Sequence, residues 1–339
     1  SYLVDTVRVS GPLLLIASIG VLAIAVEGAL STQIRRVIIA LAAVLSIVAL
    51  AQIAPVGTSN TVIQGSVVQA GGQLGTRAAS SDEAAVFTRH LEAVERHNVE
   101  TDLMVWSESS VSTFAPLEQS KELKTIAQLA NRLDAVIIAN FSEIEGDYFR
   151  NASVAIEPAG NISGRYDKVH LVPFGEFLPF EKMLSSIGLK TITNNYQSYS
   201  RGEKRDVIEL NKINFSVRIL PLICYEIIYT GNIFNDIEFD FIINISEDGW
   251  FGQSIGPHQH FVHSVYRAIE SGKYVLRSAN NGIAAVVNPL GVVEDQVNLN
   301  QSGFVDLFKT KKIEPTIFSK YGNKIFALII LLYISLIFS

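Results

Sequence analysis

Three apolar runs lie near the two ends of the chain. Residues 9–26 and 37–56 carry no charged side chain, and each is close to the ~20 residues that a helix needs to cross the hydrocarbon layer of a membrane. We therefore predict two transmembrane helices there. Residues 325–339 form a shorter apolar run, about 22 Å long as a helix at about 1.5 Å per residue, which spans a bilayer only with help from residues 321–324.

The charges beside these runs predict an orientation. The short link between the first two runs contains Arg35 and Arg36, and short basic loops stay on the cytoplasmic side of a membrane. The middle of the chain is therefore expected on the outer side. The pattern divides the chain into two membrane helices over 1–57, a domain over 58–315 and a third membrane helix over 316–339.

The middle domain alternates short β-rich runs with stretches of helical periodicity, which predicts an α/β fold. Turn signals at 157–161 and 288–291 indicate hairpin connections. The helices are expected at 81–98, 117–133 and 257–272. The strands are expected at 62–69, 103–106, 135–139, 153–157, 215–223, 241–245, 274–277 and 284–288.

Composition and charge narrow the possible functions. Of the 339 residues 48% are hydrophobic and only 18% are charged, against about 25% charged in an average soluble protein. A net charge of −6 argues against a nucleic-acid partner, because phosphates are bound by basic surfaces. A single cysteine excludes an internal disulfide scaffold.

That cysteine, Cys224, ends an apolar strand-like run and is followed by Tyr225 and Glu226. A small buried hydrophobic residue is one interpretation. The other is a nucleophile exposed where the chain turns, which needs a base to form the thiolate and a donor to hold the oxyanion. Both interpretations stay open on the position of the cysteine alone.

Two further segments carry groups that suit this chemistry. Glu108 ends a strand, and Lys168 precedes an apolar stretch that contains Glu176. A carboxylate in a dry pocket can act as a base, and an ammonium can stabilise a thiolate or an oxyanion. The alternatives are a helix-capping Glu108, a surface Lys168 and a core Cys224. The histidines do not indicate a catalytic base or a metal site. We expect His90 and His97 to lie on an exposed helix, and His258, His260 and His263 to have structural roles on another helix.

Several stretches together resemble a known family. They are residues 105–109, 166–176, 223–226, 249–260 and 276–282, and they are similar to the nitrilase or carbon–nitrogen hydrolase superfamily. The similarity is greater to its membrane branch, the apolipoprotein N-acyltransferases. The resemblance implies a nitrilase-like αββα sandwich on the outer face of a membrane, with transmembrane helices before and after it. Members of this branch carry more helices ahead of the domain, so we expect a truncated membrane portion here.

The resemblance also implies roles for individual residues. Glu108 corresponds to the general base, Lys168 to the cation that stabilises the oxyanion, and Cys224 to the nucleophile that forms a thioester. No metal or other cofactor is expected. Further residues are implied as supporting groups around the triad or as substrate-binding groups: Glu176, Tyr225 and Glu226 for support, and Trp250, Phe177 and Phe180 for the substrate.

The implied partners are a membrane phospholipid as acyl donor and a diacylglyceryl-modified apolipoprotein as acceptor, without nucleic acid. The implied location is the bacterial cytoplasmic (inner) membrane, which a multi-pass chain crosses with its catalytic domain on the outer, periplasmic side. Two alternatives stay open: a membrane-anchored amidase of the nitrilase type, and an inert membrane-tethered binding module. The apolar residues 177–184 favour the acyltransferase, because a small polar amide gains nothing from them.

Overall fold

The structure is a computed structural model that describes most of the predicted central domain. It covers residues 59–61, 64–69, 80–112, 115–146, 148–180, 198–212, 215–231, 237–308 and 310–338, together with residues 34, 37, 38 and 41. The predicted membrane span at 9–26, and nearly all of the span at 37–56, lie outside the described residues.

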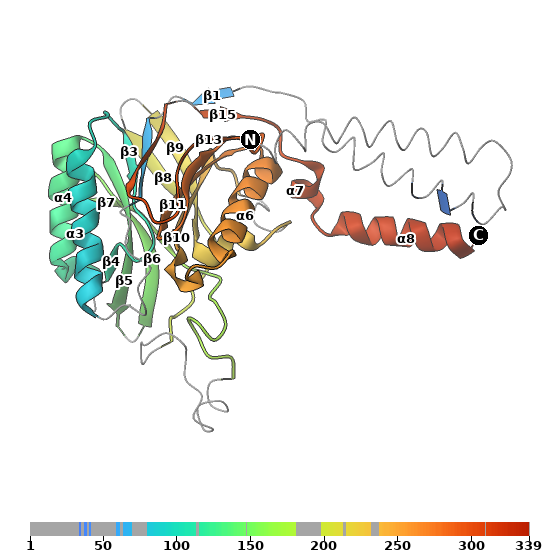
Figure 1. Cartoon of the computed structure of the whole chain (residues 1–339), viewed down its shortest axis with the longest axis horizontal. Coiled ribbons are helices and arrows are strands. Elements are labelled where there is room, and N and C mark those ends of the chain that lie inside the picture. The colour runs from blue at the N-terminus through green and yellow to red at the C-terminus, as the bar shows by residue number, and fades with distance from the viewer. Residues whose placement is uncertain are drawn as a thin grey trace.

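Two β-sheets form the centre of the molecule (Figure 1). The first has six strands in the order β13-β12-β11-β10-β9-β8. They are β8 (Ile208–Lys212), β9 (Phe215–Ile223), β10 (Phe241–Glu247), β11 (Tyr274–Asn280), β12 (Ala284–Val287) and β13 (Val293–Val297).

The second sheet has seven strands in the order β14-β2-β3-β5-β6-β7, with β4 beside β5. They are β2 (Gly65–Gln69), β3 (Leu103–Val105), β4 (Val111–Ser112), β5 (Val136–Glu145), β6 (Tyr148–Ile156), β7 (Ile162–Asp167) and β14 (Gly303–Leu307). A separate antiparallel pair joins β1 (Ser59–Thr61) to β15 (Thr310–Lys312).

Parallel strands occupy the middle of both sheets. Strand β10 pairs in parallel with β9 and β11, and β3 pairs in parallel with β2 and β5. Side chains of a strand point alternately to its two faces. In β9, Ile219 and Ile223 enter the core between the sheets, whereas Leu220 and Leu222 face outward to the helical layer. Both faces of this strand are buried, so its sequence is an almost continuous apolar run.

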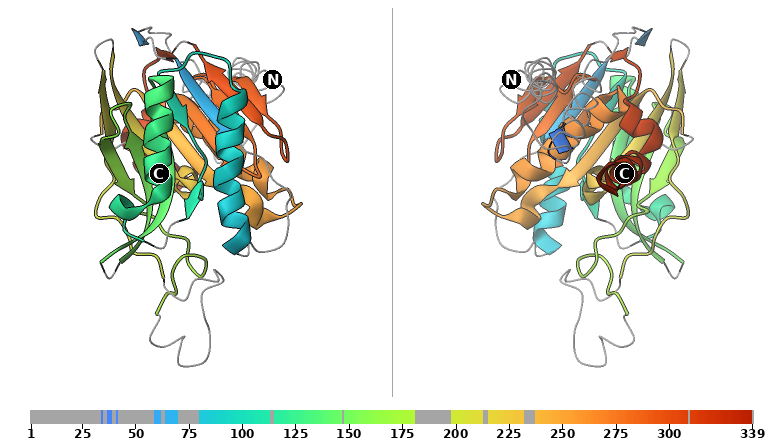
Figure 2. Two further views of the ribbon diagram at one scale, coloured as in Figure 1. Left: turned by 90° about the vertical axis from the view of Figure 1, so that its left-hand side faces the viewer. Right: turned by 90° about the vertical axis from the view of Figure 1, so that its right-hand side faces the viewer.

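Helices cover the outer face of each sheet. Helices α3 (Ser80–Arg96) and α4 (Lys121–Leu133) pack against the seven-stranded sheet, and α6 (Gly256–Ser271) packs against the six-stranded one. Figure 2 shows α3 and α4 side by side in front of their sheet. The predicted α/β sandwich of four layers, helix, sheet, sheet and helix, is therefore confirmed.

The helix predicted over 117–133 is wrong at its start. A 3-10 turn, Leu117–Gln119, comes first, and Ser120 then adopts an extended conformation with ψ of 130°. The Ser120 hydroxyl accepts a hydrogen bond from the backbone N–H of Leu123 at 3.1 Å. Serine at an N-cap satisfies a backbone donor that a helix start leaves unpaired, so α4 begins at Lys121. The two hairpins predicted from turn residues connect β6 to β7 and β12 to β13.

The chain ends in two helices, α7 (Ile317–Tyr321) and α8 (Lys324–Phe338). Helix α8 coincides with the third predicted span and extends away from the sandwich (Figure 1). Within the described part of the chain, no helix combines the length and the apolar character that crossing a membrane requires.

Candidate active site

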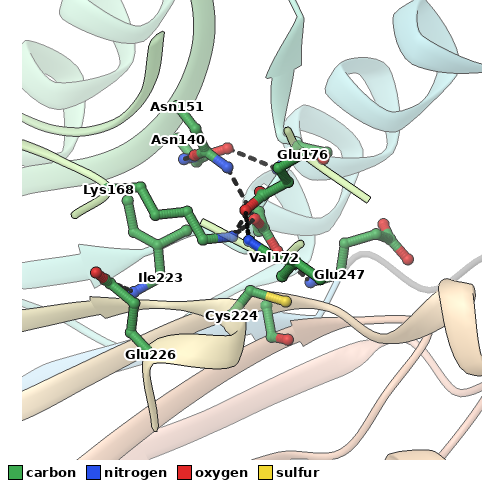
Figure 3. Close-up of polar contacts among 12 residues, drawn as sticks. Asn140, Asn151, Lys168, Val172, Glu176, Ile223, Cys224, Glu226 and Glu247 are labelled. Carbon is green, nitrogen blue, oxygen red and sulfur yellow. Dashed lines mark hydrogen bonds and ion pairs between the residues drawn. The ribbon is translucent and has the colours of Figure 1, made fainter. Parts of the chain in front are cut away.

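Three strand ends bring Glu108, Lys168 and Cys224 together. Glu108 follows β3 and Lys168 follows β7, both in the seven-stranded sheet, whereas Cys224 follows β9 in the six-stranded sheet. Figure 3 shows the Lys168 side chain reaching toward Glu176, with the sulfur of Cys224 below the lysine. The charges of Glu108 and Lys168 both act on the Cys224 thiol.

The Lys168 ammonium lies between two carboxylates. Its Nζ donates to Oε1 of Glu176 at 2.7 Å and to Oε1 of Glu108 at 3.2 Å, and the side chain is 1% exposed. Burial by itself lowers the pKa of Lys168, but the Glu108 and Glu176 carboxylates outweigh it and hold this pKa well above its usual value. Lys168 is therefore a fixed cation at neutral pH.

Glu108 is also held from two other sides. The side-chain amide of Asn151 in β6 donates to its Oε1 at 2.9 Å, and the backbone N–H of Glu247 in β10 donates to its Oε2 at 2.9 Å. Asn140 in β5 donates in turn to Asn151 Oδ1 at 2.7 Å. Sequence reasoning missed these three residues; the signal for Asn140 was a polar residue inside an apolar strand.

Glu247 is a further carboxylate beside the site. It accepts hydrogen bonds from the side-chain amide of Asn280 at 2.6 Å and from the backbone N–H of Gly249 at 2.8 Å. Burial raises the pKa of Glu247 to about 7, against the effect of these hydrogen bonds. Its main contact with the triad is through its backbone.

Cys224 adopts a left-handed backbone conformation with φ of +50°, which residues other than glycine rarely adopt. The side chain is half-buried against the core between the sheets. Burial, and then the Glu108 carboxylate, raise the pKa of the Cys224 thiol well above its usual value, although Lys168 acts in the opposite direction. The resting side chain is therefore a thiol, and a base has to remove its proton before it can attack.

Glu226 joins the turn after β9 to the segment that carries Lys168. Its carboxylate is fully buried and accepts hydrogen bonds from the backbone N–H of Ile223 at 2.9 Å, of Val169 at 3.0 Å and of His170 at 2.9 Å, as well as from the Tyr166 hydroxyl at 2.8 Å. Burial raises the pKa of Glu226, but the His170 side chain, Arg205 and the backbone donors of Ile223 and His170 hold it below its usual value. Glu226 therefore fixes Cys224 relative to Lys168.

Residues 198–202 lie against the same segment. The backbone N–H of Tyr199 donates to the carbonyl of Glu176 at 2.8 Å, and that of Gly202 donates to the carbonyl of Lys168 at 2.9 Å. A Cβ at position 202 would lie 2.3 Å from the carbonyl oxygen of Asp167, so only glycine fits there. These bonds attach the returning chain to the residues around the lysine.

The other predicted site residues have no described side-chain contact with the triad. Tyr225 is half-buried, with its ring edge-on to Tyr229. Phe177 is half-buried and its backbone bridges to Pro173. Phe180 is 80% exposed and Trp250 is 64% exposed, so the structure places their side chains at the surface. Among the described contacts, none joins the side chains of these four residues to those of Glu108, Lys168 or Cys224.

The expectation that His90 is exposed on its helix is wrong. His90 is fully buried, and its Nε2 lies 3.1 Å from the hydroxyl of Ser107, next to Glu108. Burial lowers the pKa of His90 to about 4. The residue shares a helix face with Phe87 and Val94, at spacings of three and four positions, and this spacing places it in the core. His97 is half-buried, with its Nε2 2.9 Å from Oδ1 of Asp306.

The fold and the cluster of Glu108, Lys168 and Cys224 define a nitrilase-like sandwich with a candidate acyl-transfer centre. Comparison with known proteins agrees with this class: residues 48–305 match the carbon-nitrogen hydrolase family, and the chain belongs to that family. Among solved structures, a carbon-nitrogen hydrolase superfamily protein from Xanthomonas campestris is similar, with a TM-score of 0.53 at 19% identity over 73% of this chain and 91% of that protein. That likeness is one of fold.

Curated relatives are similar in sequence. A protein named apolipoprotein N-acyltransferase from Rickettsia prowazekii is 37% identical over 230 residues, which are 66% of this chain and 45% of the relative. A protein of the same name from Rhizobium leguminosarum is 34% identical over 239 residues, which are 67% of this chain and 43% of the relative. The chain thus spans about half the length of the curated relatives it matches.

Proposed function

We propose that this chain carries the acyl-transfer centre of a lipoprotein N-acyltransferase of a bacterial cytoplasmic membrane, with the centre on the outer side. The acyl donor is a membrane phospholipid, and the acceptor is the N-terminal diacylglyceryl-cysteine of an apolipoprotein. The observation that carries the proposal is the position of Lys168, bonded to both Glu108 and Glu176 beside a thiol. The relatives named apolipoprotein N-acyltransferase support the choice of reaction.

In the first half-reaction Glu108 takes the proton of the Cys224 thiol, and the thiolate attacks the carbonyl carbon of a phospholipid ester. The resulting oxyanion is stabilised by the Lys168 ammonium. When the C–O bond of the ester breaks, Glu108 returns the proton to the departing alkoxide. The products are a lysophospholipid and an acyl thioester on Cys224.

In the second half-reaction the neutral α-amino group of the acceptor attacks the thioester carbonyl. Glu108 takes a proton from the attacking nitrogen while the C–S bond breaks, and Cys224 regains a proton as a thiol. The acceptor leaves as an amide, so the proton count balances over the cycle. Glu176 bonds to Lys168 at 2.7 Å and to the backbone N–H of Val172 at 2.9 Å, and these contacts hold the lysine in place.

Two exposed aromatic side chains suit a lipid donor. Phe180 and Trp250 present most of their surface to solvent, and aromatic rings are favoured where a protein meets the boundary of a bilayer. We propose that they and Phe177 bind the acyl donor. The described helix α8 and the predicted runs at 9–26 and 37–56 are the proposed membrane segments.

The first test asks whether Cys224 becomes acylated. The detergent-purified chain is mixed with phosphatidylethanolamine vesicles, and its intact mass is measured. We expect a mass increase of one acyl chain that hydroxylamine removes, and no increase in Cys224→Ala. Folded protein without an adduct contradicts the proposal and favours the inert binding module.

The second test identifies the acceptor. The acylated protein is mixed with a diacylglyceryl-cysteinyl peptide that has a free α-amino group, and with the same peptide N-acetylated. We expect acyl transfer to the first peptide only. Rapid hydrolysis of small amides without transfer to either peptide favours the amidase alternative.

A further inference from the structure

A buried polar network lies behind Cys224 that the proposed mechanism does not use. It joins the end of β10 and the middle of β11 to α6 through Asp248, Arg277 and His260, all of which are buried. Ser246 completes the network with a hydrogen bond to Oδ1 of Asp248 at 2.7 Å. One member, His260, contacts the backbone of the cysteine.

His260 has an acceptor at each ring nitrogen. Its Nδ1 lies 2.8 Å from Oδ1 of Asp248, and its Nε2 lies 3.1 Å from the carbonyl oxygen of Cys224. A carbonyl oxygen only accepts hydrogen bonds, so the Nε2 contact requires a proton on that nitrogen. The nearer described neighbour of Nδ1 is Asp248, and Arg277 Nη2 lies 3.3 Å from the same nitrogen. The ring is therefore oriented with Nε2 toward the backbone of the cysteine.

Arg277 and Asp248 hold the histidine in this position. Nη2 of Arg277 donates to Oδ2 of Asp248 at 2.7 Å. Burial by itself raises the pKa of Asp248, but Arg277 and His260 hold it well below its usual range, so the carboxylate stays charged. The Phe251 ring packs edge-on against the imidazole. The imidazole is thus fixed from several sides.

The peptide that His260 contacts is one that needs support. Cys224 has a φ of +50°, and a non-glycine residue keeps such a conformation only where its surroundings impose it. Glu226 holds the N-terminal side of this turn through the N–H of Ile223. His260 holds the other side through the Cys224 carbonyl, and the two contacts together fix the direction of the Cα–Cβ bond.

We propose that His260 is a positioning residue that orients the Cys224 nucleophile through the carbonyl oxygen of Cys224. The inference rests on the proposed function, since it takes Cys224 as the nucleophile. His260 thereby influences the reaction without contacting the substrate.

Two substitutions separate the two contacts of the ring. The side-chain amide of His260→Gln reaches the position of Nε2 and can donate to the Cys224 carbonyl. That of His260→Asn reaches the position of Nδ1, so it keeps the contact with Asp248 and loses the one with Cys224. If His260 positions the cysteine, the glutamine variant should be the more active of the two. If His260 only stabilises the network, the asparagine variant should be the more active.

The experiment measures the rate of Cys224 acylation from phosphatidylethanolamine vesicles by intact mass, with urea unfolding of each variant as the stability control. We expect His260→Asn to lower kcat for acylation by about 10- to 100-fold, with KM within about twofold of wild type, because a misplaced nucleophile slows the chemical step. His260→Gln should recover most of this loss even though it is the less stable variant.

A second measurement does not depend on the phospholipid. Cys224 is the only cysteine in the chain, so its alkylation by iodoacetamide can be followed by mass, and we expect this rate to change far less than acylation does. Activity that follows stability, or acylation of His260→Asn at the wild-type rate, overturns the inference. A wild-type protein that is alkylated but never acylated overturns the proposed function instead.

Discussion

Replacing Glu226 by glutamine removes a buried charge without changing the shape of the side chain. In the wild type the carboxylate accepts hydrogen bonds from the backbone N–H groups of Ile223, Val169 and His170 and from the Tyr166 hydroxyl. Glutamine keeps one acceptor oxygen and places an NH₂ group where the other was. If the amide oxygen faces Val169 and His170, its NH₂ group faces the N–H of Ile223, and two donors then oppose each other.

The expected cost follows from these contacts. A hydrogen bond to a charged group contributes about 1.5–3 kcal/mol, and a buried donor left without a partner costs a similar amount. The Ile223 bond is lost and the remaining bonds are weakened, so we expect Glu226→Gln to lower the free energy of unfolding by about 2–4 kcal/mol at pH 7. The lost bond no longer holds the turn at Cys224 in place, so acylation of Cys224 should slow as well.

The effect should depend on pH with a definite sign. The pKa of Glu226 is lowered in the folded protein, so its contribution to stability is present above its ordinary value of 4.5 and is lost as the pH falls through the folded value. The difference between wild type and Glu226→Gln should therefore be constant near neutral pH and shrink on acidification below about pH 4.5.

Urea unfolding followed by tryptophan fluorescence measures this difference at each pH. Glu238→Gln is the matched control, because the Glu238 side chain is 94% exposed and its loss should cost at most about 0.5 kcal/mol. If Glu226→Gln is as stable as the control at pH 7, or if its deficit grows on acidification, the assigned role of the buried carboxylate is refuted.

Three other predictions follow from the site. Lys168→Met leaves Glu108 and Glu176 close together without a cation, so the unfolding free energy should fall by about 3–5 kcal/mol and no Cys224 thioester should form; an acylated variant of wild-type stability contradicts this. Because burial raises the pKa of the Cys224 thiol well above its usual 9.0, its alkylation by iodoacetamide should keep accelerating as the pH rises past 9, and a plateau below pH 8.5 argues against a buried thiol. The pair of changes Phe180→Ser and Trp250→Ser should raise KM for the vesicle donor about tenfold, while alkylation of Cys224 stays unchanged; an unchanged KM removes these residues from donor binding.

Apolar runs in the sequence predicted the inner strands, because a strand that is buried on both faces has apolar residues at nearly every position. Strands β9 and β10 carry buried side chains to the interior between the sheets and to the outer helical layer. The four edge strands β7, β8, β13 and β14 were not predicted. Their sequences mix polar and apolar residues, and β13 exposes Glu294, Asp295 and Gln296, so none of them forms a continuous apolar run.

The cluster of Glu108, Lys168 and Cys224 was predictable because each group follows a strand and matches a family motif. Two residues that hold the cluster, Glu176 and Glu226, were also predicted as supporting residues from these motifs. The other residues that hold it, Asn140, Asn151, Glu247 and His260, were not predicted. The bond from Glu247 to Glu108 joins positions 139 residues apart, and His260 reaches Cys224 over 36 residues. No local spacing encodes either contact, because the first arises only when the two sheets face each other and the second only when α6 packs on the six-stranded sheet. His90 is different: its spacing from Phe87 and Val94 was visible in the sequence.

The attachment of residues 198–202 has a consequence for protein engineering. Glu176 and Lys168 receive hydrogen bonds from the backbones of Tyr199 and Gly202, and these bonds tie the returning chain directly to the residues around the ammonium. A library built around this part of the chain should therefore keep Gly202, and alkylation of Cys224 would report whether the nucleophile is still intact.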